Sequence, residues 1–224
     1  MSEFDRYGGG EYERALEHAI SIGGQDAGFY NEVKAKRLID LARRRLGDPA
    51  SLSVLDVGAG IGLMDEHLTS TFGRVVGLDV SQQMVDRASE RNPEAEYVAY
   101  DGVTFPFESG AFDVVFASCV FHHVVREERG RLAAEMARVT RDGGIVTILE
   151  HNPLNPATRL VVSRCEFDED AILLGRRESE RLLAGAGLSL AEKAYILFFP
   201  FRNDFERRLA RLPMGAQYYV ASSR

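Results

Sequence analysis

SVLDVGAGIG, residues 53–62, runs from a short apolar segment directly into a loop that contains Gly58, Gly60 and Gly62. An apolar run of about five residues that ends in turn residues is typical of a buried strand. Glycine tolerates positive φ angles and lets a ligand approach the backbone closely. The pattern therefore predicts a strand followed by a tight ligand-binding loop. Loops that bind a dinucleotide place their third glycine one residue later, which favours a different ligand here.

Strand and helix patterns alternate on both sides of this loop. Apolar residues at helical spacing predict helices over 31–46, after the glycines around 63–68, and over 126–140, and Ser81 is a favourable N-cap for a further helix. Short apolar runs predict four more strands, at 74–80, 95–101, 112–118 and 144–150. This alternation predicts right-handed crossovers and a mainly parallel sheet with helices on both faces.

The alternation stops after residue 150. Residues 151–176 are rich in turn residues at their start, and we expect them to form an insertion over the sheet, a candidate substrate lid. A helix over 178–186 and strands at 188–200 and 216–223 follow, with a short helical piece around Phe205 and Leu209 between the strands. Because these two strands follow one another closely, we expect an antiparallel pair.

Composition limits the class of protein. A chain of 224 residues with 45% hydrophobic and 27% charged residues fits one folded domain. The predicted domain, 1–224, consists of an N-terminal helical cap (1–50), a core (51–150), the lid (151–176) and a C-terminal helix with a strand pair (177–224). The net charge of −7 disfavours nucleic acid as a partner.

Targeting and metal signals are absent from the sequence. The N-terminus lacks a signal-peptide pattern, and no apolar run approaches the roughly 18 residues that span a membrane, so we expect a cytoplasmic protein without a membrane partner. Cys119 and Cys165 lie far apart without CxxC spacing, which predicts neither a disulfide nor a metal site.

Acidic residues stand at the ends of three predicted strands. Ligands of open parallel sheets bind beyond the carboxyl ends of the strands. Asp56 precedes the glycines, and Asp79 lies about 20 residues further on, where a carboxylate can bind ribose hydroxyls. Asp101 ends the third strand, where it could meet an adenine edge. A carboxylate beside the loop disfavours a phosphate and suits a cationic amino-acid group, so the loop fits a nucleoside with an amino-acid tail.

Four segments, VLDVGAGIG, VVGLDVS, AYDG and FDVVFASCVFHHV, resemble in order the motifs of class I S-adenosylmethionine-dependent methyltransferases. The resemblance covers roughly residues 50–150 and implies a Rossmann-like doubly wound α/β fold with a seven-stranded sheet whose C-terminal strand is antiparallel. It also implies S-adenosylmethionine as the cofactor and S-adenosylhomocysteine as the product. The cofactor-binding residues that it predicts are Asp56, Gly58, Ala59, Gly60, Asp79, Val80, Met84, Asp101, Gly102 and Ser118.

The resemblance also assigns parts of the cofactor to these residues. Asp56 and the glycine loop would lie near the methionine part, and Asp79 would bind the ribose. Asp101 and Gly102 would meet the adenine, on which Met84 would pack. Ser118 would offer backbone contacts near the sulfonium.

Candidate proton acceptors follow the fourth and fifth strands at the same sheet edge. These candidate catalytic residues are His122, His123, Glu150 and His151. Methyl transfer from a sulfonium is an in-line displacement that needs a base only when the acceptor carries a proton. Histidine suits that task because its pKa lies near neutrality. A structural role is the alternative for each histidine.

Two further groups of residues could approach the ligands. The lid residues Arg159, Arg164, Phe167, Asp168, Glu169 and Asp170 could line an acceptor pocket or form a solvated face. Phe29 or Tyr30 could shield the sulfonium or simply pack in a helix.

The acceptor is expected to be a small molecule. The fourth strand is not followed by the Asn/Asp-Pro-Pro-Tyr/Phe motif found in many base methyltransferases, and available histidines favour oxygen over nitrogen or carbon as the methylated atom. Two alternatives stay open, a nicotinamide-dependent oxidoreductase and a non-catalytic cofactor-binding subunit. The sequence identifies neither the acceptor nor whether the protein is a monomer or a homodimer.

Overall fold

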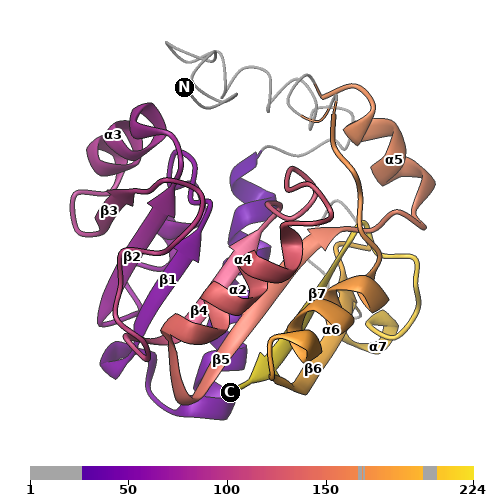
Figure 1. The fold of residues 1–224 in the computed structure, drawn as a ribbon. Helices are drawn as coiled ribbons and strands as arrows, with labels where there is room; N and C mark the ends of the chain where they lie inside the picture. Colours follow the sequence, from indigo (N-terminus) through magenta and orange to yellow (C-terminus); the bar gives the residue numbers. More distant parts are fainter. Residues whose placement is uncertain (1–26, 166–167, 169, 199–205) are drawn as a thin grey trace.

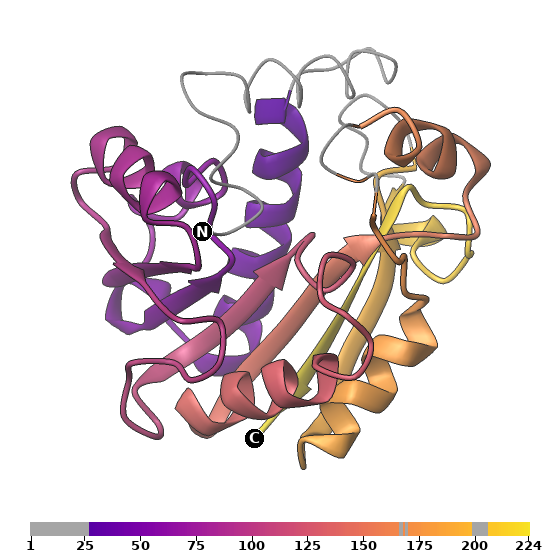
Figure 2. The same ribbon diagram turned by 45° about the horizontal axis from the view of Figure 1, so that its top comes forward.

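The computed structural model describes residues 27–165, 168, 170–198 and 206–224, and the expectations for residues 1–26, Phe167, Glu169 and Phe205 lie outside this part. One seven-stranded sheet runs through the described part, with helices on both faces (Figures 1 and 2). Its strands are β1 (Ser53–Val57), β2 (Arg74–Asp79), β3 (Glu96–Ala99), β4 (Phe112–Ser118), β5 (Thr140–His151), β6 (Ser189–Ile196) and β7 (Gln217–Ser223).

The strand order is β3-β2-β1-β4-β5-β7-β6. Strands β1 to β5 pair in parallel, whereas β7 lies antiparallel to both β5 and β6. The predicted Rossmann-like doubly wound sheet with an antiparallel C-terminal strand is therefore confirmed. The chain winds outward from β1 to β3 and then returns to β4 on the other side of β1. Ligands of open α/β sheets bind at such a reversal.

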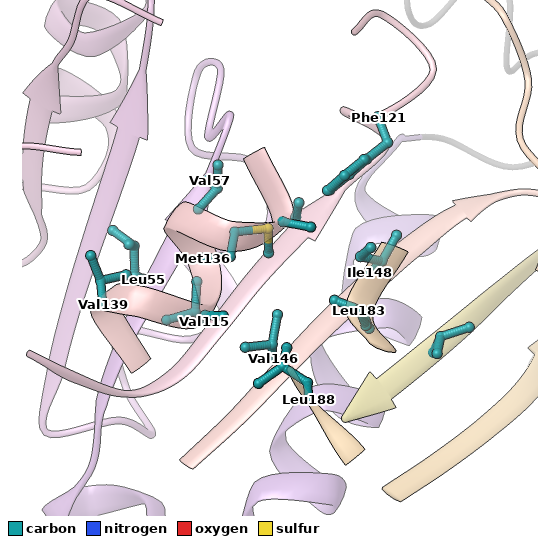
Figure 3. Close-up of a cluster of buried hydrophobic side chains, with 14 of the residues drawn as sticks. Leu55, Val57, Val115, Phe121, Met136, Val139, Val146, Ile148, Leu183 and Leu188 are labelled. Atoms are coloured by element: carbon teal, nitrogen blue, oxygen red, sulfur yellow. The ribbon is translucent and has the colours of Figure 1, made fainter. Parts of the chain in front are cut away.

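Helices cover the two faces of the sheet. They are α2 (Ala27–Leu46), α3 (Gln82–Arg91), α4 (Arg129–Val139), α5 (Pro156–Val162), α6 (Arg176–Gly185) and α7 (Glu206–Leu209), with 3₁₀ turns η2 (Pro49–Ser51) and η3 (Asp65–His67). Because side chains alternate along a strand, Leu55 packs on the face of α4 and α6, and Val54 on the face of α2. Figure 3 shows Leu55 near Met136 and Val139 of α4.

The helix expected around 63–68 and the third strand differ most clearly from their patterns. The helix expected around 63–68 is only the turn η3, and its buried Asp65 side chain accepts a hydrogen bond from the Tyr97 hydroxyl at 2.9 Å. The third strand ends at Ala99 instead of residue 101. There the Asp101 carboxylate accepts hydrogen bonds from the backbone of Val103 and Thr104, and this turn ends the pairing.

The segment after β5 begins with α5, whose N-cap Asn155 accepts hydrogen bonds from the backbone amides of Ala157 and Thr158. The rest of the predicted lid reaches α6, and its role as a lid stays a prediction. No helix in the described ranges has the length and apolarity to cross a membrane.

Candidate functional site

A cavity of about 250 Å³ opens at the carboxyl ends of the strands, beside the junction of β1 and β4. Its walls include six of the predicted cofactor-binding residues, Gly58, Gly60, Asp79, Val80, Met84 and Gly102. Tyr100, Cys119, His123 and Arg131 also line it. Residues from the ends of β1, β2 and β4 and from the segment after β3 are thus brought to one cavity, as the strand-end argument predicts.

The glycine loop has the backbone that its sequence requires. Gly58, Gly60 and Gly62 have φ angles of +76°, +56° and +72°, which side chains rarely adopt. A Cβ at Gly58 would also lie 2.5 Å from Cγ2 of Val120, so the β1 loop packs closely against the chain after β4. The loop is therefore a close-fitting backbone wall of the cavity.

Asp79 ties this loop to the end of β2. Its Oδ2 accepts a hydrogen bond from the Gly60 amide at 2.8 Å, and its Oδ1 accepts one from the Ser81 amide at 2.9 Å. The side chain is largely buried yet lines the cavity. An ionised carboxylate can accept about four hydrogen bonds, so Asp79 suits a ligand that presents hydroxyl groups.

Asp56 lies beneath the loop and is absent from the cavity wall. Burial, the nearby carboxyl of Asp65 and that of Asp79 raise the pKa of Asp56 well above its ordinary value, although Lys34 lowers it. Burial also raises the pKa of Asp65 to about 7. Oδ1 of Asp56 is buried without a hydrogen-bond partner in the described part of the chain. Such an oxygen is costly unless a donor reaches it.

Besides Asp56, three predicted cofactor residues do not line the cavity. Asp101 is exposed, and its bonds to Val103 and Thr104 lower the pKa of the carboxyl. Ser118 accepts a hydrogen bond from Nζ of Lys34 at 2.9 Å. The Ala59 amide donates to the carbonyl of Leu78 at 3.1 Å, which fixes the loop. The direct ligand contacts expected of these residues stay predictions.

Two of the four candidate catalytic residues, His122 and Glu150, are buried and pair with each other beside the cavity. His122 is 2% exposed, with Nδ1 2.7 Å from Oε2 of Glu150 and Nε2 3.2 Å from Oδ1 of Asp168. Burial favours the neutral imidazole, but Glu150 and Asp168 outweigh it and raise the pKa of His122 well above its ordinary value. The pKa of Glu150 is lowered, because His122 outweighs the burial that would raise it.

His123 differs from its neighbour because it lines the cavity. Its Nε2 lies 3.5 Å from Oδ1 of Asp168, and the rings of His122 and His123 are 4.1 Å apart between centroids. Burial and the charge of His122 lower the pKa of His123 to about 4. Among the four predicted catalytic residues, only His123 lies on the wall of the described cavity.

His151 faces Cys119 instead. Burial would raise the pKa of the Cys119 thiol, but His151 and Lys34 lower it to about 7. Burial would lower the pKa of His151, and Cys119 raises it. Nε2 of Gln217 lies 3.4 Å from both Sγ of Cys119 and Nδ1 of His151. Sequence reasoning missed Cys119 as a cavity residue, although its place directly after Ser118 at the end of β4 is a usable signal.

The matching family model is that of a methyltransferase domain, over residues 55–148. The chain is 30% identical over 176 residues to the biotin biosynthesis bifunctional protein BioHC of Cellvibrio japonicus, covering 73% of this chain and 34% of that protein. It is 28% identical over 215 residues to a ubiquinone biosynthesis O-methyltransferase of Rhizobium etli, covering 87% of this chain and 85% of that one.

A solved structure with the same fold is geranyl diphosphate C-methyltransferase of Streptomyces coelicolor A3(2). The TM-score is 0.65 at 19% identity, over 97% of this chain and 85% of that one. At this identity the likeness shows the fold alone. The chain spans about a third of the length of the first two curated relatives that it matches, with 34% and 33% covered.

Proposed function

This chain belongs to the class I S-adenosylmethionine-dependent methyltransferases, and from that premise we propose that it transfers the methyl group of this cofactor to a small-molecule acceptor. The observation that carries the proposal is the cavity at the β1 and β4 junction, walled by Gly58, Gly60 and Asp79. Its position at the reversal of strand order is the usual site for a nucleotide-like ligand.

The described residues fit S-adenosylmethionine in two respects. The positive φ angles of Gly58 and Gly60 bring the loop backbone to the cavity wall, where a ligand can approach it closely. Besides its hydrogen bond with the Asp65 carboxyl, the buried Asp56 has Oδ1 without an N–H donor in the described part of the chain, and the ammonium of an amino-acid tail that reached beneath the loop would supply one. In this proposal Asp56 and the glycine loop hold the methionine part, and Asp79 accepts hydrogen bonds from the ribose.

The adenine would lie between the chain segments that follow β2 and β3. Met84, 2% exposed, and Tyr100 offer apolar surfaces on the cavity wall, and Gly102 lies beside them. Asp101 would act indirectly, since its carboxylate caps the turn that places Gly102 on the wall.

When bound, the cofactor supplies an electrophilic methyl group on a sulfonium. The chain would bind and orient the acceptor against it and exclude water, which accounts for much of the catalysis of a displacement. His123 is our candidate for the residue that acts on the acceptor, because it is the predicted catalytic residue on the cavity wall. With its pKa lowered to about 4, His123 is neutral near pH 7 and has a free ring nitrogen for a hydroxyl proton, although it is a weaker base than an ordinary histidine; on this ground we favour O-methylation.

The proposed acceptor class has support from the relatives. One is named for ubiquinone biosynthesis and one for biotin biosynthesis, and both names denote small molecules. The net charge of −7 agrees with an acceptor other than nucleic acid.

Calorimetry with S-adenosylmethionine and S-adenosylhomocysteine tests the cofactor, and a panel of phenols, sugars and amines, assayed for S-adenosylhomocysteine release, tests the reaction. We expect both compounds to bind and at least one acceptor class to release the product. Absence of binding at millimolar concentration would overturn the proposal. A titration with reduced nicotinamide cofactor tests the oxidoreductase alternative, and binding without turnover on any acceptor would favour the non-catalytic subunit.

A further inference from the structure

Three ligating atoms from separate parts of the chain meet beside the cavity. They are ring nitrogens of His122 and His123 and a carboxylate oxygen of Asp168, all within 4.8 Å of one another. We propose that this cluster binds one divalent transition-metal ion, of the kind that Zn²⁺ represents. The cysteine spacing led us to expect no metal site, and this cluster contains no cysteine.

The distances suit a metal ion. Oδ1 of Asp168 lies 3.2 Å from Nε2 of His122 and 3.5 Å from Nε2 of His123. Around an ion with bonds of about 2.0–2.2 Å, neighbouring ligand atoms lie roughly 3.0–3.5 Å apart. Both distances to Asp168 thus match a bound ion, and the two histidine nitrogens, which lie within 4.8 Å of each other, would move together as far as the ion requires.

The surroundings of His122 also resemble those of a metal ligand. Its Nδ1 lies 2.7 Å from Oε2 of Glu150, which is fully buried. Metal-binding histidines usually donate their other ring N–H to a carboxylate, which fixes the tautomer and aims the free nitrogen at the ion. Here that arrangement aims Nε2 of His122 at Asp168.

Without an ion, a proton on Nε2 of His122 links the imidazole to Asp168. A divalent ion placed between the two would replace this proton. Imidazole nitrogens with a single carboxylate oxygen favour zinc, iron or a similar ion over magnesium or calcium, which prefer oxygen ligands. The competing explanation is that the cluster holds only a proton, and the experiment below separates the two.

The open positions of the ion would face the cavity, because His123 lies on the cavity wall. The role of the ion in catalysis rests on the proposed methyltransferase function. An acceptor hydroxyl bound to it would lose its proton to water more readily, because a metal ion lowers the pKa of a bound oxygen. The new O–C bond would then form as the S–CH₃ bond breaks, with its electron pair left on sulfur. In the metal-bound protein, His123 would serve as a metal ligand and not as the base.

The test uses the full chain without an affinity tag, stripped with a chelator and held without cofactor or acceptor. Calorimetry with Zn²⁺ and visible absorption with Co²⁺ measure the affinity and the stoichiometry. We expect one ion per chain, bound at micromolar concentration or below. His123→Ala and Asp168→Ala should each weaken binding at least tenfold. Glu150→Gln should weaken it roughly 10- to 100-fold, as loss of an outer partner does.

His67→Gln is the matched control, because His67 lies on η3 and takes no part in the cluster. Circular dichroism of every variant shows whether it is folded. Absence of stoichiometric binding by the unchanged protein at 100 µM Zn²⁺, or unaltered affinity in folded His123→Ala and Asp168→Ala variants, overturns the proposal. Because no cofactor is present, failure here leaves the methyltransferase proposal intact, and failure of cofactor binding leaves the metal site intact.

Discussion

The Gly60 amide donates a hydrogen bond of 2.8 Å to Oδ2 of Asp79, which joins the loop after β1 to the end of β2. This single contact connects the two features of the sequence that point to a nucleoside ligand. Asp79 would thus serve twice, since it fixes the glycine loop and also lines the cavity. A substitution at this position should therefore affect both the loop and ligand binding.

Asp79→Ala should weaken S-adenosylhomocysteine binding by roughly 10- to 100-fold, because a hydrogen bond to a charged group contributes about 1.5–3 kcal/mol. Calorimetry measures this change. Asp86→Ala is the control, because Asp86 lies on the exposed side of α3 and is bonded to Gln82. Equal affinities for the unchanged protein and Asp79→Ala would remove Asp79 from the binding site.

Gly58→Ala should destabilise the protein. Its φ of +76° costs a side chain about 1–2 kcal/mol, and the new Cβ would lie 2.5 Å from Val120. The expected fall in Tm is about 2–8 °C for a chain of this size. Gly130→Ala on α4 is the control, because no atom lies within 4 Å of its Cβ position. That variant should keep or raise Tm, and a similar loss in both would contradict the role of backbone strain.

Asp65 should make stability depend on pH. Burial raises its pKa to about 7 in the folded protein, above the value of 3.8 that an unburied group has. The folded protein favours the neutral carboxyl. The stability that Asp65 contributes is therefore fully present below about pH 4 and is lost as the pH rises towards 7. Asp65→Asn should be progressively more stable relative to the unchanged protein over that range, by up to about 1.4 kcal/mol per pKa unit.

Urea denaturation at intervals between pH 4 and pH 8 measures the difference between the two proteins. Asp86→Asn, at an exposed position, gives the background dependence. A difference that stays constant with pH would show that the Asp65 carboxyl titrates at its ordinary pKa.

An ion pair between a buried arginine and a partly exposed glutamate joins α4 to α6. The guanidinium of Arg129 is fully buried, and its Nη1 lies 2.7 Å from Oε1 of Glu178. Glu178→Ala should cost about 1–3 kcal/mol, because the buried guanidinium loses its charged partner but keeps the carbonyls of Val124 and Ile172 as acceptors. The exposed pair of Arg74 and Glu96 is the control, and Glu96→Ala should cost less than about 1 kcal/mol. Denaturant unfolding compares them, and equal costs would contradict the argument from burial.

Most of the fold follows from local pattern. The run FDVVFAS predicts β4 with both of its ends, because a buried strand needs a continuous apolar segment. Strand ends set by side-chain chemistry were harder to predict. Asp101 terminates β3 early by binding Val103 and Thr104, and an Asp in the same sequence could equally have stayed in the strand.

The site is harder to predict from the sequence than the fold, because its contacts join segments that are distant in the chain. Glycines 58 and 60 and Asp79 reach the cavity as predicted, since strand ends meet at one sheet edge. Asp168 was only one of several charged lid residues, yet it contacts His122, 46 positions away. Neither periodicity nor spacing predicts such a contact. From the sequence, His122 and His123 were therefore equally good candidates. The structure distinguishes them, because His122 is buried and His123 lines the cavity.

This separation leads to the last prediction. His123→Ala should lower turnover by roughly 10²- to 10⁴-fold, the usual range for loss of a group that acts on the reacting proton. Its affinity for S-adenosylhomocysteine should change little, because Gly58 and Asp79 are untouched.

His151→Gln is the comparison, since His151 contacts Cys119 and is absent from the cavity wall. This variant should lower turnover less than tenfold. Steady-state kinetics on an identified acceptor, with calorimetry on the same preparations, measures both. Full turnover in folded His123→Ala would leave proximity as the source of catalysis, whereas a larger loss in His151→Gln would move the chemistry to the Cys119 side of the site.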